Sequence, residues 1–542
     1  MQTHPTRRLP LLALLAFAPC CFGDEALQQY HRQAREHDER QVEERLRQLE
    51  RETPRPDPGR DTPAPSDAAC WPVSGLSLSG NQRIGNARIA AATAELLRPC
   101  MSAAQINRLL KAITHLYLQT GYLASRPYLA RTPISGQPLE IFIVEGFVEA
   151  IEVSEPDLPL SLSSAFPGML GEPLQLRQLE QGMDQLNRLR SFDLTADIEP
   201  GEFDGGSRLL LRPRSRPSRW ELRASLDNRD GAGQGSHFAQ LGAGLDSPAQ
   251  LNDYLYVAHL RTLANARGNT QLSSLDYRVP YGSWSVAVNF NQMDSQSHLQ
   301  LAGLSRDTRV AAQSLRAERT LWRDGQRMLN GYSQWTHRTL DSQIAGLQIG
   351  VQQSDTQVTE IGLNGLWVDA GMWSADLAHA RGRQRIGATP QFEKYRASLG
   401  HSRLGSAFGQ AWQVSGQLSL QYSPDALPPL EQKNLAVPGF RLAPANSASG
   451  VAFDAQLNLP QPLGMGLVLT PTWGIGAGWA RHHPRDVLPT RSREQKVLGL
   501  SAGASLQWRQ TRLSLAYQHP LHDSYAERLP PGFWHSELSL AL

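Results

Sequence analysis

The sequence has little net charge and no long apolar run beyond its N-terminus. Its 542 residues include 53 basic and 51 acidic side chains, which leaves a net charge of +2. A balance this even argues against nucleic acid as the main partner. No apolar stretch after the N-terminus reaches the roughly 20 residues that a membrane-spanning helix requires. The composition therefore excludes a helical membrane protein and predicts no nucleic-acid partner.

Signals of enzyme chemistry are also missing. The sequence contains no His-Glu-x-x-His, and its 15 histidines show no metal-ligand spacing. The segment "GIGAG" at 474–478 lies in a strand pattern, where glycines flatten a wall and do not cradle phosphate. We therefore expect no catalytic residues, no metal site and no cofactor.

Cysteine is scarce, and its placement fits an exported protein. Two arginines precede the apolar run "LPLLALLAFAP", which is the plan of a signal peptide over residues 1–23. Two of the four cysteines lie inside that segment. The other two, Cys70 and Cys100, form an even pair in an exported protein, so we predict a disulfide between them. By closing a loop of about 30 residues, it would contribute on the order of 3 kcal/mol.

A polar helix and a linker are expected after the signal peptide. Residues 24–50 contain no glycine or proline and are rich in Glu, Arg and Gln, which predicts one helix. A helix polar nearly all round either crosses solvent or lies in an aqueous lumen. A solvated or partly disordered arm explains this stretch equally well. Residues 51–69 are proline-rich and charged, which is typical of a semi-rigid linker.

Two α+β modules are predicted next, at 70–146 and 147–216. Each has the order strand, helix, helix, strand, strand over about 70 residues, a repeat of architecture more than of sequence. In the first module, 86–97 and 103–120 are expected to be helical. In the second, 174–189 carries leucines on one helical face.

From residue 217 to residue 542 the chain reads as a series of strands. Segments such as "WSVAVNF" (284–290) and "WQVSGQLSLQY" (412–422) alternate apolar and polar side chains with period two. A soluble sandwich would alternate in the same way. Three features favour a membrane barrel: a polar face of Gln, Ser, Asn and Gly with few charges pairing across it, an alternating last strand, and aromatic residues at strand ends. These aromatic residues are Tyr254, Trp284, Trp412, Tyr422, Trp508 and Tyr517. At roughly 20 residues for each strand with its connection, typical strands having about 9–11 residues, the length allows about 16 strands.

This order of segments resembles the TpsB transporters of two-partner secretion, which are relatives of the outer-membrane assembly proteins. The modules are similar to POTRA domains, and "CWPVSGLSLSG" with the later Cys100 matches the disulfide-bearing first POTRA of that family. "THLYLQTGYLASRPYL" and "LEQGMDQLNRLRS" match further family motifs. The motif positions in this chain are Tyr117, Gly121, Tyr122, Ser125, Arg126, Asn187, Arg188 and Leu189.

The resemblance also implies a long extracellular loop near 425–449 that folds back into the barrel. In the family its tip reads Val-Arg-Gly-Phe/Tyr, and the arginine pairs with an aspartate on a lumen-facing strand. The matching positions here are Val437, Pro438, Gly439 and Phe440, with Gly476 in the aspartate's place. Both members of the ion pair are therefore missing. As a hypothesis, Arg441 substitutes for the arginine and pairs with a lumenal acid such as Asp454.

The function implied by the resemblance is secretion across a bacterial outer membrane. The POTRA domains would lie in the periplasm and receive a large unfolded TpsA-type exoprotein, an adhesin, haemolysin or contact-inhibition toxin. The exoprotein would pass through the barrel, and the helix at 24–50 would plug the pore at rest. We expect a monomer surrounded by outer-membrane lipid, with no enzyme activity. A passive porin and a barrel-assembly insertase are the alternatives.

Overall fold

A computed structural model describes residues 70–215, 217–228, 237–263, 268–299, 304–348, 350, 353–386, 390–441, 443–483 and 492–542. The expected signal peptide, plug helix and linker over 1–69 lie outside the described residues. Within the described ranges, none of the helices combines the length and the apolar character needed to cross a membrane.

The first module (residues 70–146) is a four-stranded sheet packed against two helices. Its elements are β1 (Cys70–Ser79), α3 (Asn86–Thr93), β2 (Cys100–Ser102), α4 (Ala103–Gln119), β3 (Arg126–Leu129) and β4 (Gln137–Val144). The sheet order is β2-β1-β4-β3, and β1 runs parallel to β4. Helix α4 begins with a capping box in which Ser102 and Gln105 each satisfy the other's backbone N–H.

The disulfide between Cys70 and Cys100 is formed, with Cα atoms 5.5 Å apart. It joins β1 to the three-residue strand β2, where Pro72 faces Cys100 in the ladder. The sequence did not predict β2, because three residues are too few to show an alternating pattern.

The second module (residues 147–215) has a three-stranded sheet and one long helix. Its elements are β5 (Phe147–Val153), α5 (Leu162–Ala165), α6 (Leu176–Asn187), β6 (Asp193–Pro200) and β7 (Gly206–Ser215). The order β5-β7-β6 leaves β6 at one edge of this sheet. The apolar face of α6, with Leu179, Met183 and Leu186, is buried in the module's core.

Sixteen long strands close into one antiparallel barrel. Two short strands, β15 (Leu347–Gln348) and β23 (Gln461–Gly464), belong to the hairpins that contain β16 and β22. The last strand pairs with the first, so Leu538 faces Leu226 and the described barrel has no open edge. The long strands are β8 (Trp220–Asp227), β9 (Phe238–Asp246), β10 (Tyr254–Thr262), β11 (Gly268–Tyr281), β12 (Trp284–Leu299), β13 (Leu304–Arg323), β14 (Arg327–Ile344), β16 (Ser354–Val368), β17 (Met372–Ile386), β18 (Gln391–Ala407), β19 (Gln410–Tyr422), β22 (Ser449–Asn458), β24 (Leu467–Arg481), β25 (Glu494–Trp508), β26 (Thr511–Asp523) and β27 (Phe533–Ala541).

The outer face of the barrel is apolar and carries aromatic residues near both ends. Trp220, Trp284 and Trp508 are exposed at the end beside the modules, and Tyr422 and Trp534 are exposed at the opposite end. The eight residue steps from Trp534 to Leu542 span about 26 Å along the chain at about 3.3 Å per residue. Because strands of membrane barrels are tilted by about 35–45°, this length corresponds to a height of roughly 20 Å, close to the apolar band of about 25 Å found in such barrels.

Two expectations about the barrel faces are wrong. Tyr254 does not belong to an outer aromatic girdle, because its hydroxyl donates to Glu221 at 3.3 Å on the inner face. Whether an aromatic residue at a strand start faces the lumen or the lipid depends on the strand register, and a shift of one residue moves its side chain to the other face. The lumen also pairs more charges than expected. Inward ion pairs join Arg316 to Glu318 and Arg396 to Glu360.

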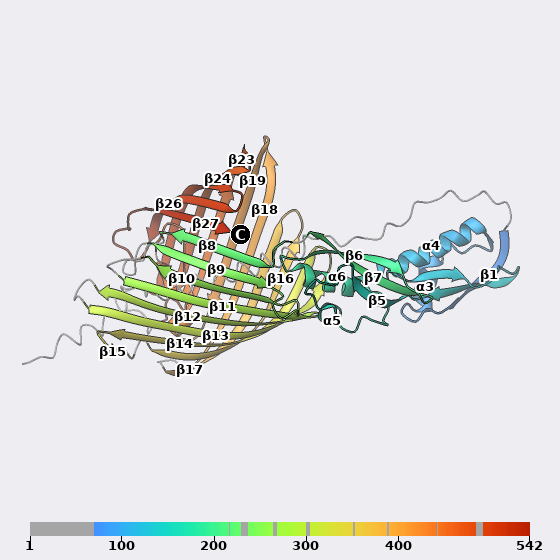
Figure 1. Ribbon diagram of the computed structural model, residues 1–542, viewed down its shortest axis with the longest axis horizontal. Helices are drawn as coiled ribbons and strands as arrows, with labels where there is room; N and C mark the ends of the chain where they lie inside the picture. Colours follow the sequence, from blue (N-terminus) through green and yellow to red (C-terminus); the bar gives the residue numbers. More distant parts are fainter. Residues whose placement is uncertain are drawn as a thin grey trace, which may run out of the picture.

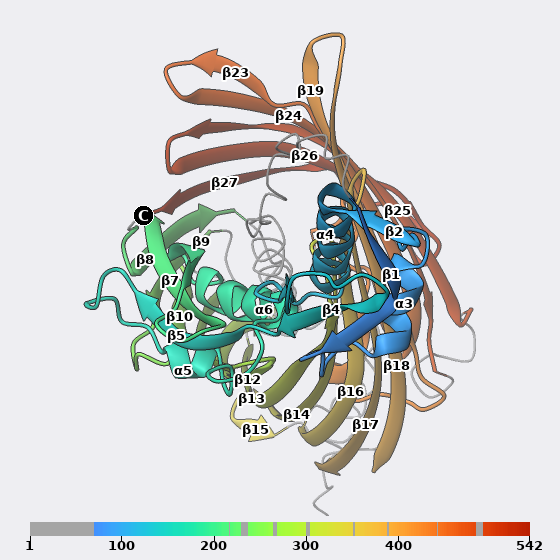
Figure 2. The ribbon, with the colours of Figure 1, turned by 90° about the vertical axis from the view of Figure 1, so that its right-hand side faces the viewer.

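The two modules form a row that leaves one end of the barrel (Figure 1). Seen from the modules, the barrel wall curves behind them (Figure 2). The second module lies against the turns that join barrel strands on this side. The Asn252 side chain, in the turn between β9 and β10, donates to Ser161 O and accepts from Ser161 N, both at 2.8 Å. Ser191 N donates to Asp246 Oδ2 at 2.7 Å. These bonds fix the second module over the barrel mouth.

Candidate functional site: the lumen and the in-folded loop

The in-folded loop, residues 423–448, connects β19 to β22 at the end of the barrel away from the modules. It begins with a short 3₁₀ turn at Pro429–Glu431 and continues as a two-stranded hairpin of β20 (Lys433–Asn434) and β21 (Asn446–Ser447). Leu435 N donates to Ala445 O at 2.9 Å, which extends the hairpin toward its tip. The loop therefore has its own backbone structure inside the barrel.

The tip of the loop lies on three inward-facing glycines of β24 and β25: Gly476, Gly478 and Gly499, here called the glycine patch. A Cβ built on Gly476 would lie 2.4 Å from Pro438 Cδ, and one on Gly499 would lie 1.8 Å from Pro438 O. Any other residue at these two positions would displace the loop. The glycines thus leave the space that Pro438 fills.

Apolar and polar contacts complete the docking of the tip. Leu435 and Val437 are buried in a cluster with Ala480 and Val497 of the wall. Gly439 N donates to Gln518 Oε1 of β26 at 2.7 Å. Gly439 has φ +95°, and a Cβ there would lie 2.4 Å from His519 O, so this position also requires glycine.

Of the other two residues of the expected loop site, the structure places Arg441 away from the glycine patch and Asp454 beside it. The Arg441 guanidinium lies over the ring of Phe533, 4.6 Å from its centre. Asp454 is on β22, opposite Gly476 in the ladder. The Arg441–Asp454 ion pair stays a prediction. The contact with Phe533 could not be found from sequence, because it depends on where the loop crosses β27.

The POTRA motif residues lie mainly in cores and at the junction of the two modules. Tyr117 is fully buried and donates to Glu145 Oε1 at 2.8 Å. Gly121 O accepts from Leu176 N of the second module at 2.8 Å. Arg126 donates to Leu123 O at 3.0 Å. The rings of Tyr117 and Tyr122 meet edge to face, and Ser125 and Leu189 are buried.

Asn187 has a more specific position. Its side chain donates to Leu194 O at 2.9 Å and accepts from Leu194 N at 2.7 Å. It thereby ties the end of α6 to edge strand β6. Arg188 follows it as the C-cap of α6.

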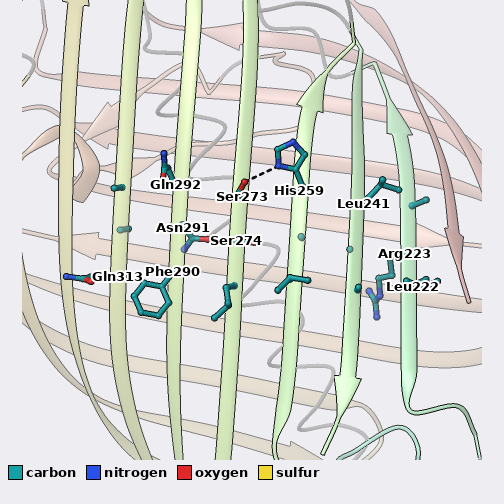
Figure 3. Close-up of a pocket in the computed structure, with 18 of the residues that line it drawn as sticks. Leu222, Arg223, Leu241, His259, Ser273, Ser274, Phe290, Asn291, Gln292 and Gln313 are labelled. Atoms are coloured by element: carbon teal, nitrogen blue, oxygen red, sulfur yellow. Dashed lines mark hydrogen bonds between the residues drawn. The ribbon is translucent and has the colours of Figure 1, made fainter. Parts of the chain in front are cut away.

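A groove of about 1040 Å³ follows the outer face of the wall from β8 to β14 (Figure 3). Exposed Leu222 and Leu241 border it, and its polar end contains His259 and Ser273, whose side chains are 3.0 Å apart (Figure 3). Because it faces away from the lumen, we assign it no part in the passage of a polymer.

One enzyme-like pattern occurs in the sequence, since residues 499–503 read Gly-x-Ser-x-Gly. A nucleophile elbow needs a sharp turn between a strand and a helix. Here the pattern lies wholly inside β25 and forms part of the wall. In the part of the chain that the structure describes, no group of three His, Cys, Asp or Glu side chains is placed to hold a metal ion.

Comparison with known proteins decides the family. Residues 205–506 match the family described as "Haemolysin secretion/activation protein ShlB/FhaC/HecB". The chain belongs to this family. Residues 71–146 match its ShlB-type POTRA domain and residues 147–200 match a POTRA domain, so the resemblance to TpsB proteins is confirmed.

Two curated relatives and two solved structures of this secretion family cover most of the chain. Hemolysin transporter protein ShlB of Serratia marcescens is 30% identical over 472 residues, covering 83% of this chain and 82% of the relative. Outer membrane transporter CdiB of Escherichia coli is 28% identical over 468 residues, covering 80% of this chain and 77% of the relative. The structure of CdiB from Escherichia coli has a TM-score of 0.81 at 22% identity, covering 95% of this chain and 98% of that chain. The structure of CdiB from Acinetobacter baumannii has a TM-score of 0.76 at 17% identity, covering 96% of this chain and 100% of that chain. This likeness confirms the fold, a 16-stranded barrel preceded by POTRA domains.

Proposed function

We propose that this protein is the outer-membrane translocase of a two-partner secretion system. Its POTRA domains receive a large unfolded TpsA-type exoprotein in the periplasm, and its barrel secretes that client. The observation that carries this proposal is the folded loop inside a closed barrel whose periplasmic mouth is covered by the second POTRA domain. Transport of the client through the barrel requires no covalent bond to be made or broken, so we propose no enzyme activity. Folding of the client outside the cell would supply the free energy for its secretion.

Edge strand β6 is the part of the second POTRA domain best suited to receive an extended client. An extended segment can add to an open sheet edge through main-chain hydrogen bonds. Asn187 binds both main-chain groups of Leu194, so these groups point away from β7. By the period of two, the main-chain groups of Ile198 point the same way. Strand β6 begins near the barrel and ends near the first POTRA domain, so it leads toward the mouth.

A substitution at Ile198 tests this edge. Ile198→Pro removes the main-chain N–H, whereas Ile198→Val keeps it and serves as the control. We expect secretion to fall about tenfold with proline and to stay unchanged with valine. A proline variant that reaches the outer membrane in normal amount and secretes normally would contradict the role of β6, without contradicting secretion itself.

The function as a whole is tested by comparing culture supernatants of the parent strain and a clean deletion. We expect the deletion to remove one large exported protein and to leave the others. Loss of outer-membrane barrels instead would indicate an insertase. An unchanged supernatant, together with an open channel in the purified protein, would indicate a porin.

A further inference from the structure

Three charged side chains from distant parts of the chain meet in the lumen. Glu431, in the 3₁₀ turn of the in-folded loop, accepts a hydrogen bond from Lys394 of β18 at 2.6 Å and another from Arg338 of β14. The Glu431 side chain has no exposed surface, and that of Lys394 is 9% exposed. We call these residues the Glu431 triad.

The Glu431 triad and the glycine patch lie on opposite sides of the strands from which the loop emerges. Strands β14 and β18 stand on one side of β19 and β22, between which the loop emerges, and β24 to β26 stand on the other side. The loop therefore binds the wall at two separate places. Its base carries the charge contact, and its tip carries the close packing of Pro438.

Further contacts fix Glu431 in this place. Gln421 Nε2 donates to Glu431 O at 3.1 Å and to Ala448 O at 3.3 Å, so one side chain holds both ends of the loop. The neighbouring Leu430 belongs to an apolar lumenal cluster that includes Met293 and Val310. A carboxylate buried this completely is stable only while its cationic partners remain beside it.

We propose that Glu431 positions the in-folded loop in the lumen through Arg338 and Lys394, and that this contact must break before a client passes. The contact places the acid on the loop and the bases on the wall. It is separate from the tip and does not involve Arg441 or Asp454. The requirement to break rests on the proposed secretion function, whereas the positioning of the loop does not.

The first test measures current through the purified full-length protein in planar lipid bilayers. Glu431→Gln keeps the shape of the side chain and removes its charge, and Glu318→Gln does the same for a lumenal acid that pairs with Arg316. We expect the time spent open to rise roughly tenfold or more in Glu431→Gln, because this change removes the buried charge that pairs the loop with Arg338 and Lys394. In Glu318→Gln the time spent open should stay unchanged. Equal opening in both variants, or no opening in Glu431→Gln, would overturn the proposal.

A charge exchange separates pairing from general damage to the barrel. Glu431→Lys alone should open the channel, and Glu431→Lys combined with Lys394→Glu should close it again. Heat-modifiable migration on gels checks that each barrel has folded. A folded double variant that stays as open as the single one would overturn the pairing of these two residues.

Trypsin cleavage on intact cells gives a second readout that does not depend on current. A loop released to the cell surface exposes Lys433 and Arg441 to the protease. We expect cleavage in Glu431→Gln and protection in Glu318→Gln, and protection in both would overturn the proposal. If the deletion strain loses no exported protein but Glu431→Gln still opens and is cleaved, the positioning role stands and the proposed secretion function fails.

Discussion

The ring of Pro438 occupies the space that a side chain at Gly476 would need, since a Cβ there would lie 2.4 Å from Pro438 Cδ. The family resemblance implies an arginine and an aspartate at these two positions. In this chain, close packing stands where an ion pair is expected. Losing both charges together leaves no single buried charge without a partner, which would be costly.

Restoring only the acid should therefore release the tip of the loop. Gly476→Asp adds volume where Pro438 lies, and overpacking of this kind costs about 1–3 kcal/mol. We expect more frequent channel opening, measured as current through purified protein in planar bilayers. Pro438→Arg combined with Gly476→Asp should close the channel again. Gln413→Asp, which adds a lumenal acid away from the loop, is the control, and a closed Gly476→Asp channel would contradict the packing argument.

The hydrogen bond from Gly439 N to Gln518 should contribute to the same docking. Its donor and acceptor are 2.7 Å apart, and such a bond contributes about 1 kcal/mol. We expect Gln518→Leu to increase trypsin cleavage of the loop on intact cells severalfold. Gln518→Glu keeps an acceptor and should remain protected. Equal cleavage of the two variants would show that the bond does not hold the tip.

The sequence predicted the large elements because each carries a local pattern. Alternation with period two indicated the barrel strands, and the helical spacing of Leu179 and Leu186 indicated the core face of α6. The two cysteines of the exported chain predicted the disulfide. These signals need no knowledge of which segments are neighbours in space.

The Glu431 triad could not be predicted in this way. Glu431 is 93 positions from Arg338 and 37 from Lys394, and neither separation corresponds to a sequence pattern that would indicate contact. The three side chains meet only because the barrel closes and the loop folds inward. The same limit explains the error about lumenal charges, since inward pairs are set by strand register.

The disulfide should stabilise the first module without affecting the barrel. Cys70 and Cys100 close a loop of about 30 residues, so its loss should cost about 3 kcal/mol. Replacing both cysteines with serine should leave heat-modifiable barrel migration unchanged and make the first module sensitive to protease. The parent protein treated with reductant should behave in the same way. A resistant first module in both cases would show that its core is sufficient.

The charge contact of Glu431 should withstand mild acid. Burial alone would raise the pKa of Glu431, but Arg338 and Lys394 lower it from 4.5 to about 2. A lowered pKa means that the contact is fully present above pH 4.5, weakens below that value and is lost below about pH 2. Channel opening in planar bilayers should therefore be the same at about pH 7 and about pH 5 and should rise near pH 3. Glu431→Gln should open equally at the first two values, and a rise in the parent protein between them would contradict the pairing.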